Sequence, residues 1–192
     1  MSVKTELLRS VGEYVHVYNR GTYRDEIFFS KRNYDYFVRR ITERVDENLV
    51  ALHAYCLMPN HFHFILQQLQ PSGISAFVKG VCDGYVKAIN RQEKRSGHLL
   101  EGKYKMKPID DIQSLLYVSR YVHMNPVHAH LVKSPTDWIH SSCREYCGLR
   151  KSLFVTTEDV LKGLGNSEDY LTYLLGYSSD EEEKVDRFLF GG

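Results

Sequence analysis

Two histidines separated by one residue, His61 and His63, are the first side chains whose type and spacing suggest chemistry. They open a run of aromatic and branched residues that predicts a β-strand. Alternate residues of a strand point to the same face, so both imidazoles can converge on one metal ion. Two partly buried histidines that each hydrogen-bond to a backbone or carboxylate oxygen remain the alternative. A structural zinc site would need two more Cys or His ligands, and the neighbouring sequence offers none.

A second pair with the same spacing, His128 and His130, serves as a comparison. It follows Asn125-Pro-Val127, in a segment where no strand is predicted. Side chains two residues apart in a helical turn do not face each other. We therefore expect His128 and His130 to be surface residues.

Tyr117, Tyr121 and Asn125 are spaced by four residues on a predicted helix, so they lie one above the other on one face. Tyrosines on helices mostly belong to the core, and that interpretation stays open for each of them. The amide at the end of this stripe favours a functional role, because Asn125 could complete a metal site next to Tyr121.

Such a site would have a clear use for a tyrosine. A phenol has a pKa near 10 and is a poor nucleophile at neutral pH. A divalent ion held by His61, His63 and Asn125 could polarise a phosphodiester and stabilise the charge that builds on its oxygens. Attack by Tyr121 would leave a 5′-phosphotyrosine and a free 3′-OH. Imidazole and amide oxygen ligands suit Mn²⁺ somewhat better than Mg²⁺, although Mg²⁺ is more abundant in cells.

The elements that must position these residues follow from hydrophobic periodicity. Alternation and branched residues predict strands at residues 14–20, 49–58, 61–67 and 103–109, and helical spacing predicts helices at residues 30–46, 72–91 and 110–124. Only Pro59 and Asn60 separate the second and third strands, which predicts a tight hairpin. Asp110 or Asp111 is expected to cap the last helix, and Pro126 is expected to end it.

This order of elements predicts an α+β fold, the ferredoxin-like split βαβ arrangement. We expect an antiparallel sheet with two helices on one face, an added tyrosine-bearing helix and a small C-terminal helical appendage. The predicted domain boundaries are residues 1–148 for the main domain and 149–192 for the appendage, to which the sequence assigns no role.

Length and composition fit this picture. A chain of 192 residues with 43% hydrophobic residues can build one proper core. No apolar run approaches the roughly 20 residues that a membrane-spanning helix needs, and the N-terminus lacks the pattern of a signal peptide. We therefore expect a cytoplasmic protein without a membrane partner. The four cysteines are scattered and are expected to be reduced thiols.

The charge distribution says more than the net charge of +1. Residues 87–107 hold seven basic and two acidic side chains, while an acidic run at residues 180–183 offsets this excess in the total. A basic stretch of this kind is either a solvated face or a surface for phosphates.

Four motifs together resemble one known family. Met58-Pro-Asn-His-Phe-His63 is similar to the HUH motif (His, hydrophobic, His) of the single-tyrosine transposases, and Arg120-Tyr-Val-His-Met-Asn-Pro-Val127 resembles their tyrosine-helix signature. Tyr18-Asn-Arg-Gly21 and Gly102-Lys-Tyr-Lys105 match two further blocks. The motifs fall in the right order within residues 12–148. Among these transposases, the chain most resembles the REP-associated tyrosine transposases, which act on short palindromic repeats.

The resemblance implies metal binding by His61 and His63, with Asn125 as third ligand and a divalent ion, Mg²⁺ or Mn²⁺, as cofactor. It implies that Tyr121 rather than Tyr117 is the nucleophile, since the family's nucleophile sits five residues before the proline. It also implies cleavage and rejoining of single-stranded or hairpin DNA. Members of the family are monomers or dimers that exchange the tyrosine helix, so a homodimer stays open.

With these motifs in place, basic residues gain candidate DNA-binding roles. Lys103 and Lys105, on a predicted strand, and Arg120, on the tyrosine helix, could hold phosphates near the metal. Arg20 and Arg24 could hold flanking single-stranded DNA, with Tyr18 and Tyr23 stacking on its bases. For each of these residues, an ordinary surface role remains the alternative.

The chain departs from the family pattern at three positions. His128 and His130 stand where Arg and Gly are expected, and Glu101 stands where Gln is usual. These departures concern the choice of DNA more than the reaction. Three other functions remain in view: a catalytically silent hairpin-binding protein of the same fold, a metal-dependent hydrolase that activates water, and a protein-interaction domain.

Overall fold

The computed structural model describes residues 10–162, 164 and 167–176. Four strands form one sheet in the order β2-β3-β1-β4, with every neighbouring pair antiparallel. The strands are β1 (Tyr14–Arg20), β2 (Val50–Met58), β3 (His61–Gln68) and β4 (Lys105–Ile109). This is the strand order of the ferredoxin-like split βαβ arrangement, so the predicted α+β fold is confirmed.

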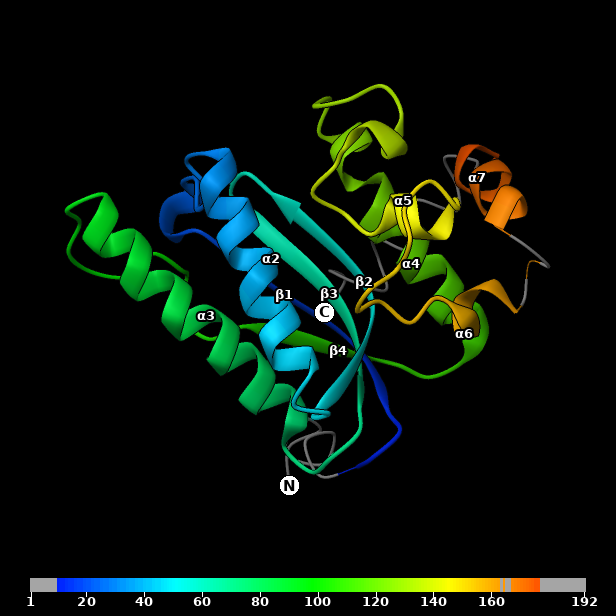
Figure 1. The fold of residues 1–192 in the computed structure, drawn as a ribbon, viewed down its shortest axis with the longest axis horizontal. Helices are drawn as coiled ribbons and strands as arrows, with labels where there is room; N and C mark the ends of the chain where they lie inside the picture. The colour runs from blue at the N-terminus through cyan, green and yellow to red at the C-terminus, as the bar shows by residue number, and fades with distance from the viewer. Residues whose placement is uncertain (1–9, 163, 165–166, 177–192) are drawn as a thin grey trace.

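Helices cover both faces of the sheet. The long helices α2 (Lys31–Val45) and α3 (Gly73–Gln92) lie on one face, and α4 (Ile112–His128) lies on the other (Figure 1). The short elements are η1 (Thr22–Arg24), η2 (Pro135–Asp137), α5 (Cys143–Tyr146), α6 (Glu158–Leu161) and α7 (Ser167–Leu175). Those that follow α4 gather on its side of the sheet.

An aromatic core fills the layer between the sheet and helices α2 and α3. Phe62 and Phe64 of β3 are fully buried, and the ring centre of Phe37 on α2 lies 5.5 Å from that of Phe62. Phe64 also meets Phe77 of α3, with ring centres 5.8 Å apart. Because side chains alternate along a strand, this core directs His61 and His63 to the opposite face, under α4.

Helix α4 begins at a side-chain cap and continues past a proline. Asp111 accepts a hydrogen bond from the backbone N–H of Ser114 at 2.7 Å, as the sequence predicted for one of two aspartates. The prediction that Pro126 ends the helix is wrong, because α4 continues to His128. Proline removes one N–H but has a helical φ, and only part of a turn follows it. Asn125 therefore lies inside the helix, one turn beyond Tyr121.

The segments after α4 fix this helix over the sheet. The two ring nitrogens of the buried His123 lie 2.7 Å from the hydroxyl oxygens of Tyr170 and Ser142. Ser142 also accepts a hydrogen bond from the backbone N–H of Tyr55 on β2 at 2.9 Å. Residues 140–142 add backbone hydrogen bonds to β2, an edge strand that would otherwise leave its ladder open.

Several smaller expectations can be compared with the structure. His128 and His130 are exposed, as predicted for surface residues. All four cysteines are free thiols, three of them buried. Within the described ranges, no helix has the length and apolar character needed to cross a membrane. The acidic run at residues 180–183 lies outside the described residues.

Candidate active site

The turn between β2 and β3 sets the orientation of His61. The side chain of Asn60 donates from Nδ2 to the carbonyl oxygen of Arg24 at 3.1 Å, so its Oδ1 must be an acceptor. That Oδ1 lies 2.6 Å from Nδ1 of His61, which therefore carries the proton of the neutral ring. The lone pair of His61 is left on Nε2, directed toward Asn125.

His63 is oriented by a third histidine. His16 on β1 is fully buried, and its Nε2 lies 2.9 Å from Nδ1 of His63. If His63 donates this hydrogen bond, its Nε2 keeps a lone pair, and that Nε2 is buried with no hydrogen-bond partner among the described residues. Nδ1 of His16 is also buried without a hydrogen-bond partner among the described residues, so either arrangement leaves one unpaired N–H, on His16 or on His63. A metal ion at Nε2 of His63 would be compatible only with the arrangement in which Nδ1 of His63 carries the proton.

Burial keeps all three rings neutral. It lowers the pKa of His61 and lowers that of His63 well below its ordinary value. Burial, with a smaller contribution from the charge of Lys107, lowers the pKa of His16 to about 3. Neutral imidazole is the form that binds a metal ion.

These donors fit a divalent cation. Nε2 of His61 lies 3.2 Å from Oδ1 of Asn125, and with the proton on Nδ1 both atoms are acceptors. Two lone pairs that face each other repel unless a donor or a cation lies between them. Nε2 of His63 adds a third lone pair when Nδ1 of that ring carries the proton. Among the described residues, no third His, Cys, Asp or Glu completes a metal-binding group. The amide oxygen of Asn125 is therefore the available third donor.

Tyr121 lies beside the histidines of its own chain. Its ring centre is 5.7 Å from that of His63 and 6.3 Å from that of His16, with edge-to-face geometry in both pairs. Tyr121, His61 and His63 line the same cavity of about 290 Å³, whereas Tyr117, one turn earlier on α4, does not. The geometry thus separates the two tyrosines between which the residue spacing alone could not choose.

Three of the five predicted DNA-binding residues line this cavity. Arg20 and Arg24 come from the end of β1 and from η1, and Lys105 comes from the start of β4. Glu101 lies in the same wall and accepts hydrogen bonds from Nε and Nη2 of the Arg20 guanidinium. This contact with Arg20 lowers the pKa of the Glu101 carboxyl. Glu101, one of the positions at which the chain departs from the family pattern, therefore places a negative charge against Arg20.

The other two predicted residues lie elsewhere. Lys103 is exposed but precedes β4, which begins at Lys105, so it is not on the strand as expected. Arg120 is buried with 3% of its surface exposed, and its Nη2 donates to the carbonyl oxygen of Leu174 at 2.8 Å. On a helix, residues 120 and 121 face different directions. Arg120 therefore ties α4 to α7, and this placement argues against a phosphate contact.

A strained turn follows β1 at the mouth of the cavity. Tyr23 and Arg24 have positive φ angles of 58° and 63°, a conformation that costs non-glycine residues energy and tends to occur at functional sites. The turn needs a glycine before it, because a Cβ on Gly21 would lie 2.0 Å from the carbonyl oxygen of Asp25. The result is a Tyr23 side chain with 90% of its surface exposed.

Sequence reasoning missed two residues of the site, His16 and Asn60. His16 alternates with Tyr14 and Tyr18 on β1, so its face of the strand was predictable. Its partner was not, because the antiparallel register of β1 with β3 comes from tertiary pairing. Asn60 was noted only as a turn residue, although it directly precedes His61.

Comparisons with known proteins identify the family and the fold of the chain. The family model described as "Transposase IS200 like" matches residues 10–125. No curated protein matches the chain significantly. The structure of a REP-associated tyrosine transposase bound to a REP hairpin aligns with a TM-score of 0.61 at 16% identity, over 78% of this chain and 87% of that chain. At this level of identity, the likeness shows a shared α+β fold.

A second solved structure is similar over a shorter length. It is a candidate transposase from Deinococcus radiodurans r1, with a TM-score of 0.43 and 17% identity over 59% of this chain and 91% of that chain. The first structure shows a shared fold, and the family model matches more than half of the 192 residues. The chain therefore belongs to the IS200-like transposase family.

Proposed function

We propose that this protein is a metal-dependent DNA strand-transferase that cleaves and rejoins single-stranded or hairpin DNA through Tyr121. The observation that carries the proposal is the convergence of His61 Nε2, His63 Nε2 and Asn125 Oδ1 beside Tyr121. A DNA-binding protein without activity has no need of these four groups together. The hairpin in the structure of the REP-associated relative supports DNA as the partner.

His61, His63 and Asn125 would hold a divalent ion, Mg²⁺ or Mn²⁺. Bound there, such an ion supplies Lewis-acid polarisation of the scissile phosphate. Asn60 and His16 are positioning residues. Asn60 places the proton of His61 on Nδ1, and His16 can accept the Nδ1 proton of His63 when a metal ion lies at Nε2. The buried, neutral rings lose no ligand capacity to protonation at neutral pH.

Tyr121 acts as the nucleophile. Its phenolic oxygen forms a bond to phosphorus while the bond from phosphorus to the 3′-oxygen breaks. The phenolic proton passes to water, and the departing 3′-oxygen takes up a proton to become a free 3′-OH. The phosphotyrosine keeps the phosphodiester's bond energy, so the 3′-OH of another strand can reverse the step without ATP.

Residues around the cavity hold the DNA on either side of the scissile bond. Arg20, Arg24 and Lys105 are placed to contact phosphates. The exposed ring of Tyr23 is a platform on which an unpaired base can stack. Single-stranded DNA suits such a platform, because the bases of a closed duplex are not available for stacking on a side chain.

The experiment is a cleavage assay on pooled hairpin-bearing single-stranded oligonucleotides with Mg²⁺ or Mn²⁺. The proposal predicts cleavage by the native chain, none with EDTA, and none by His61→Ala or His63→Ala. The exposed His130→Ala is the matched control and should cleave normally. Hairpin binding without cleavage would instead support the catalytically silent binding protein, and cleavage that needs no metal would contradict the assigned site.

A further inference from the structure

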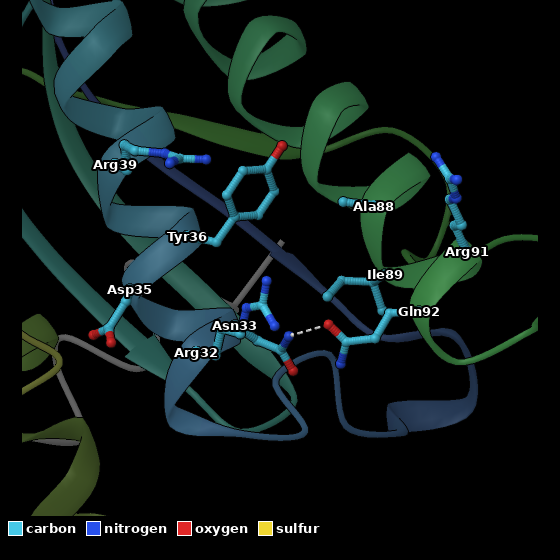
Figure 2. A pocket seen from close by; sticks show the side chains of 9 residues that line it. All are labelled: Arg32, Asn33, Asp35, Tyr36, Arg39, Ala88, Ile89, Arg91 and Gln92. Carbon is cyan, nitrogen blue, oxygen red and sulfur yellow. Dashed lines mark hydrogen bonds between the residues drawn. The ribbon is translucent and has the colours of Figure 1, made fainter.

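A second cavity lies between α2 and α3, on the face of the sheet opposite to α4. Its volume is about 830 Å³. Figure 2 shows the side chains that line it, among them Arg32 and Arg39 of α2 and Arg91 of α3. We call this cavity the α2–α3 groove. One acidic residue, Asp35, also lines it.

The charges of the groove are unequally paired. Nζ of Lys31 lies 2.7 Å from Oδ2 of Asp35. Nε of Arg39 lies 3.8 Å from Oε1 of Glu43, and the Arg39 guanidinium lies over the ring of Tyr36. Within the part of the chain that the structure describes, no ion pair or hydrogen bond engages the exposed guanidinium groups of Arg32 and Arg91. Two unneutralised guanidinium groups at one groove favour an anionic ligand.

Arg40, on the same two-helix layer, provides a contrast. Its Nη2 donates to the backbone carbonyl of Gly80 at 2.6 Å, so this guanidinium joins α2 to α3. A Cβ on Gly84 would lie 2.8 Å from Nη2 of Arg40, so the helix surface is shaped around it. Arg40 is thus part of the packing, whereas Arg32 and Arg91 are available to a partner.

The groove and the candidate active site both involve segments at one end of the molecule. The start of α2 and the end of α3 both lie at the end where β2 turns into β3 (Figure 1). The segment after α3 is tied to η1, since Thr22 donates from its backbone N–H to Leu99 and from its hydroxyl to His98. A second contact joins the segments next to these helices: the guanidinium of Arg95, after α3, lies 5.7 Å from the centre of the ring of Phe29, before α2.

We propose that the α2–α3 groove binds the phosphate backbone of the hairpin stem whose flanking strand enters the Tyr121 cavity. The proposal rests on the proposed function, and it deepens it by naming where the paired part of the DNA lies. A backbone contact fits better than a base contact, because the aromatic ring in the groove, Tyr36, is half-buried under Arg39. Guanidinium groups bind phosphate oxygens well, and such contacts position the DNA without reading its sequence.

The test compares Arg32→Gln/Arg91→Gln with a charge-matched control, Lys133→Gln/Lys151→Gln. The control residues are exposed and line neither cavity. Binding of a fluorescent hairpin is measured by anisotropy between about 50 mM and 200 mM KCl. The plot of log K against log salt has a negative slope, and each lost phosphate contact makes it less steep by about one unit. The groove variant should therefore lose about two units of slope and about tenfold in affinity, and the control should lose neither.

Two further measurements make the result specific. A single strand without a stem should bind the native chain and the groove variant equally. Equal thermal melting of the variants excludes a folding defect.

Three outcomes would overturn the proposal. One is a groove variant that keeps the native salt slope for the hairpin. Another is a groove variant that binds the hairpin normally but is no longer stabilised against heat by inorganic phosphate, while the native chain and the control variant still are. That result would make the groove a site for small anions. If the native chain binds no hairpin at all, the proposed function fails and the groove proposal fails with it.

Discussion

Nε2 of His16 lies 2.9 Å from Nδ1 of His63, on the buried face of the sheet that α4 covers. The contact joins β1 to β3, whose register places His16 opposite Ile65, two residues beyond His63. A buried neutral histidine thereby decides which nitrogen of a neighbouring histidine faces the cavity. In metal sites, partners of this kind fix the ring and raise the basicity of the ligand atom.

Replacing His16 with Phe should weaken Mn²⁺ binding by about 10-fold to 100-fold, because His63 loses the acceptor for its Nδ1 proton. Calorimetric titration measures the affinity, and ¹⁵N NMR of the metal-free protein reports where the proton of His63 resides. His16→Gln, whose side-chain oxygen can accept the same proton, should recover part of the affinity. His53→Phe is the matched control, a buried histidine of β2 outside the site. Native affinity and an unchanged His63 tautomer in His16→Phe would refute the role of His16.

The histidine pair, its orientation and the tyrosine stripe could be predicted from the sequence because each depends on local periodicity. Alternation along residues 61–67 separates Phe62 from the histidines, and the four-residue spacing of Tyr121 and Asn125 fixes their common face. Contacts between distant segments could not be predicted in this way. The His16–His63 contact depends on strand register, and the burial of Arg120 depends on where α7 packs.

Helix ends were harder to predict than helix faces. Pro126 marks a place where the backbone loses one hydrogen bond, but the packing of α4 on β2 and on the segments after residue 134 outweighs that loss. Ser30 stands at the N-cap position of α2, but its side chain makes no capping hydrogen bond there. The side chain of Asn33 instead accepts from the backbone N–H of Phe29 at 3.0 Å.

Glu101→Gln should strengthen hairpin binding by a few-fold, because it removes the carboxylate that engages Arg20 at the cavity wall. The exposed guanidinium then becomes available to one more phosphate, so the salt slope should steepen by about one. Anisotropy titrations at several KCl concentrations measure both quantities. Glu158→Gln, an exposed residue of α6, provides the same change of charge away from the cavity. If the two variants bind alike, the pairing of Glu101 with Arg20 does not limit DNA binding.

Stability should fall as the pH is lowered below neutrality, and His123 should account for part of the fall. Burial among Tyr170, Ser142 and Tyr146 lowers its pKa to about 3, while the unfolded chain has the ordinary value near 6.5. Between these values the unfolded state binds one more proton. The stabilising contribution is therefore complete above pH 6.5 and is lost as the pH falls toward 3.

Urea unfolding in EDTA at a series of pH values between about 7 and 5 measures this dependence. The free energy of unfolding of His123→Gln should vary less steeply with pH than that of the native chain, by up to about 1.4 kcal/mol per pH unit. The exposed His130→Gln should keep the native slope. Identical slopes for all three proteins would show that His123 does not remain neutral on folding.

One chain supplies the histidine pair and the tyrosine, so two inactive variants should not rescue each other. Tyr121 of α4 lies beside His63 of the same chain, and no exchange of α4 between subunits is needed to complete the site. A mixture of Tyr121→Phe with His61→Ala/His63→Ala should therefore stay inactive in the cleavage assay. Recovery of cleavage on mixing would show that the active form combines the tyrosine helix of one subunit with the histidines of another.

The most direct test of the proposed mechanism is to trap the DNA on the enzyme. A hairpin oligonucleotide that the protein is known to cleave is labelled at one end or the other and incubated with the protein and Mn²⁺. The mixture is denatured and resolved on a gel, and the adduct is analysed by mass spectrometry. The proposal predicts a covalent adduct on Tyr121 that carries the strand 3′ to the cut, joined through its 5′-phosphate. The adduct should persist in Tyr117→Phe and disappear in Tyr121→Phe. Cleavage that continues in Tyr121→Phe without any adduct would contradict the mechanism and point to a hydrolase that activates water.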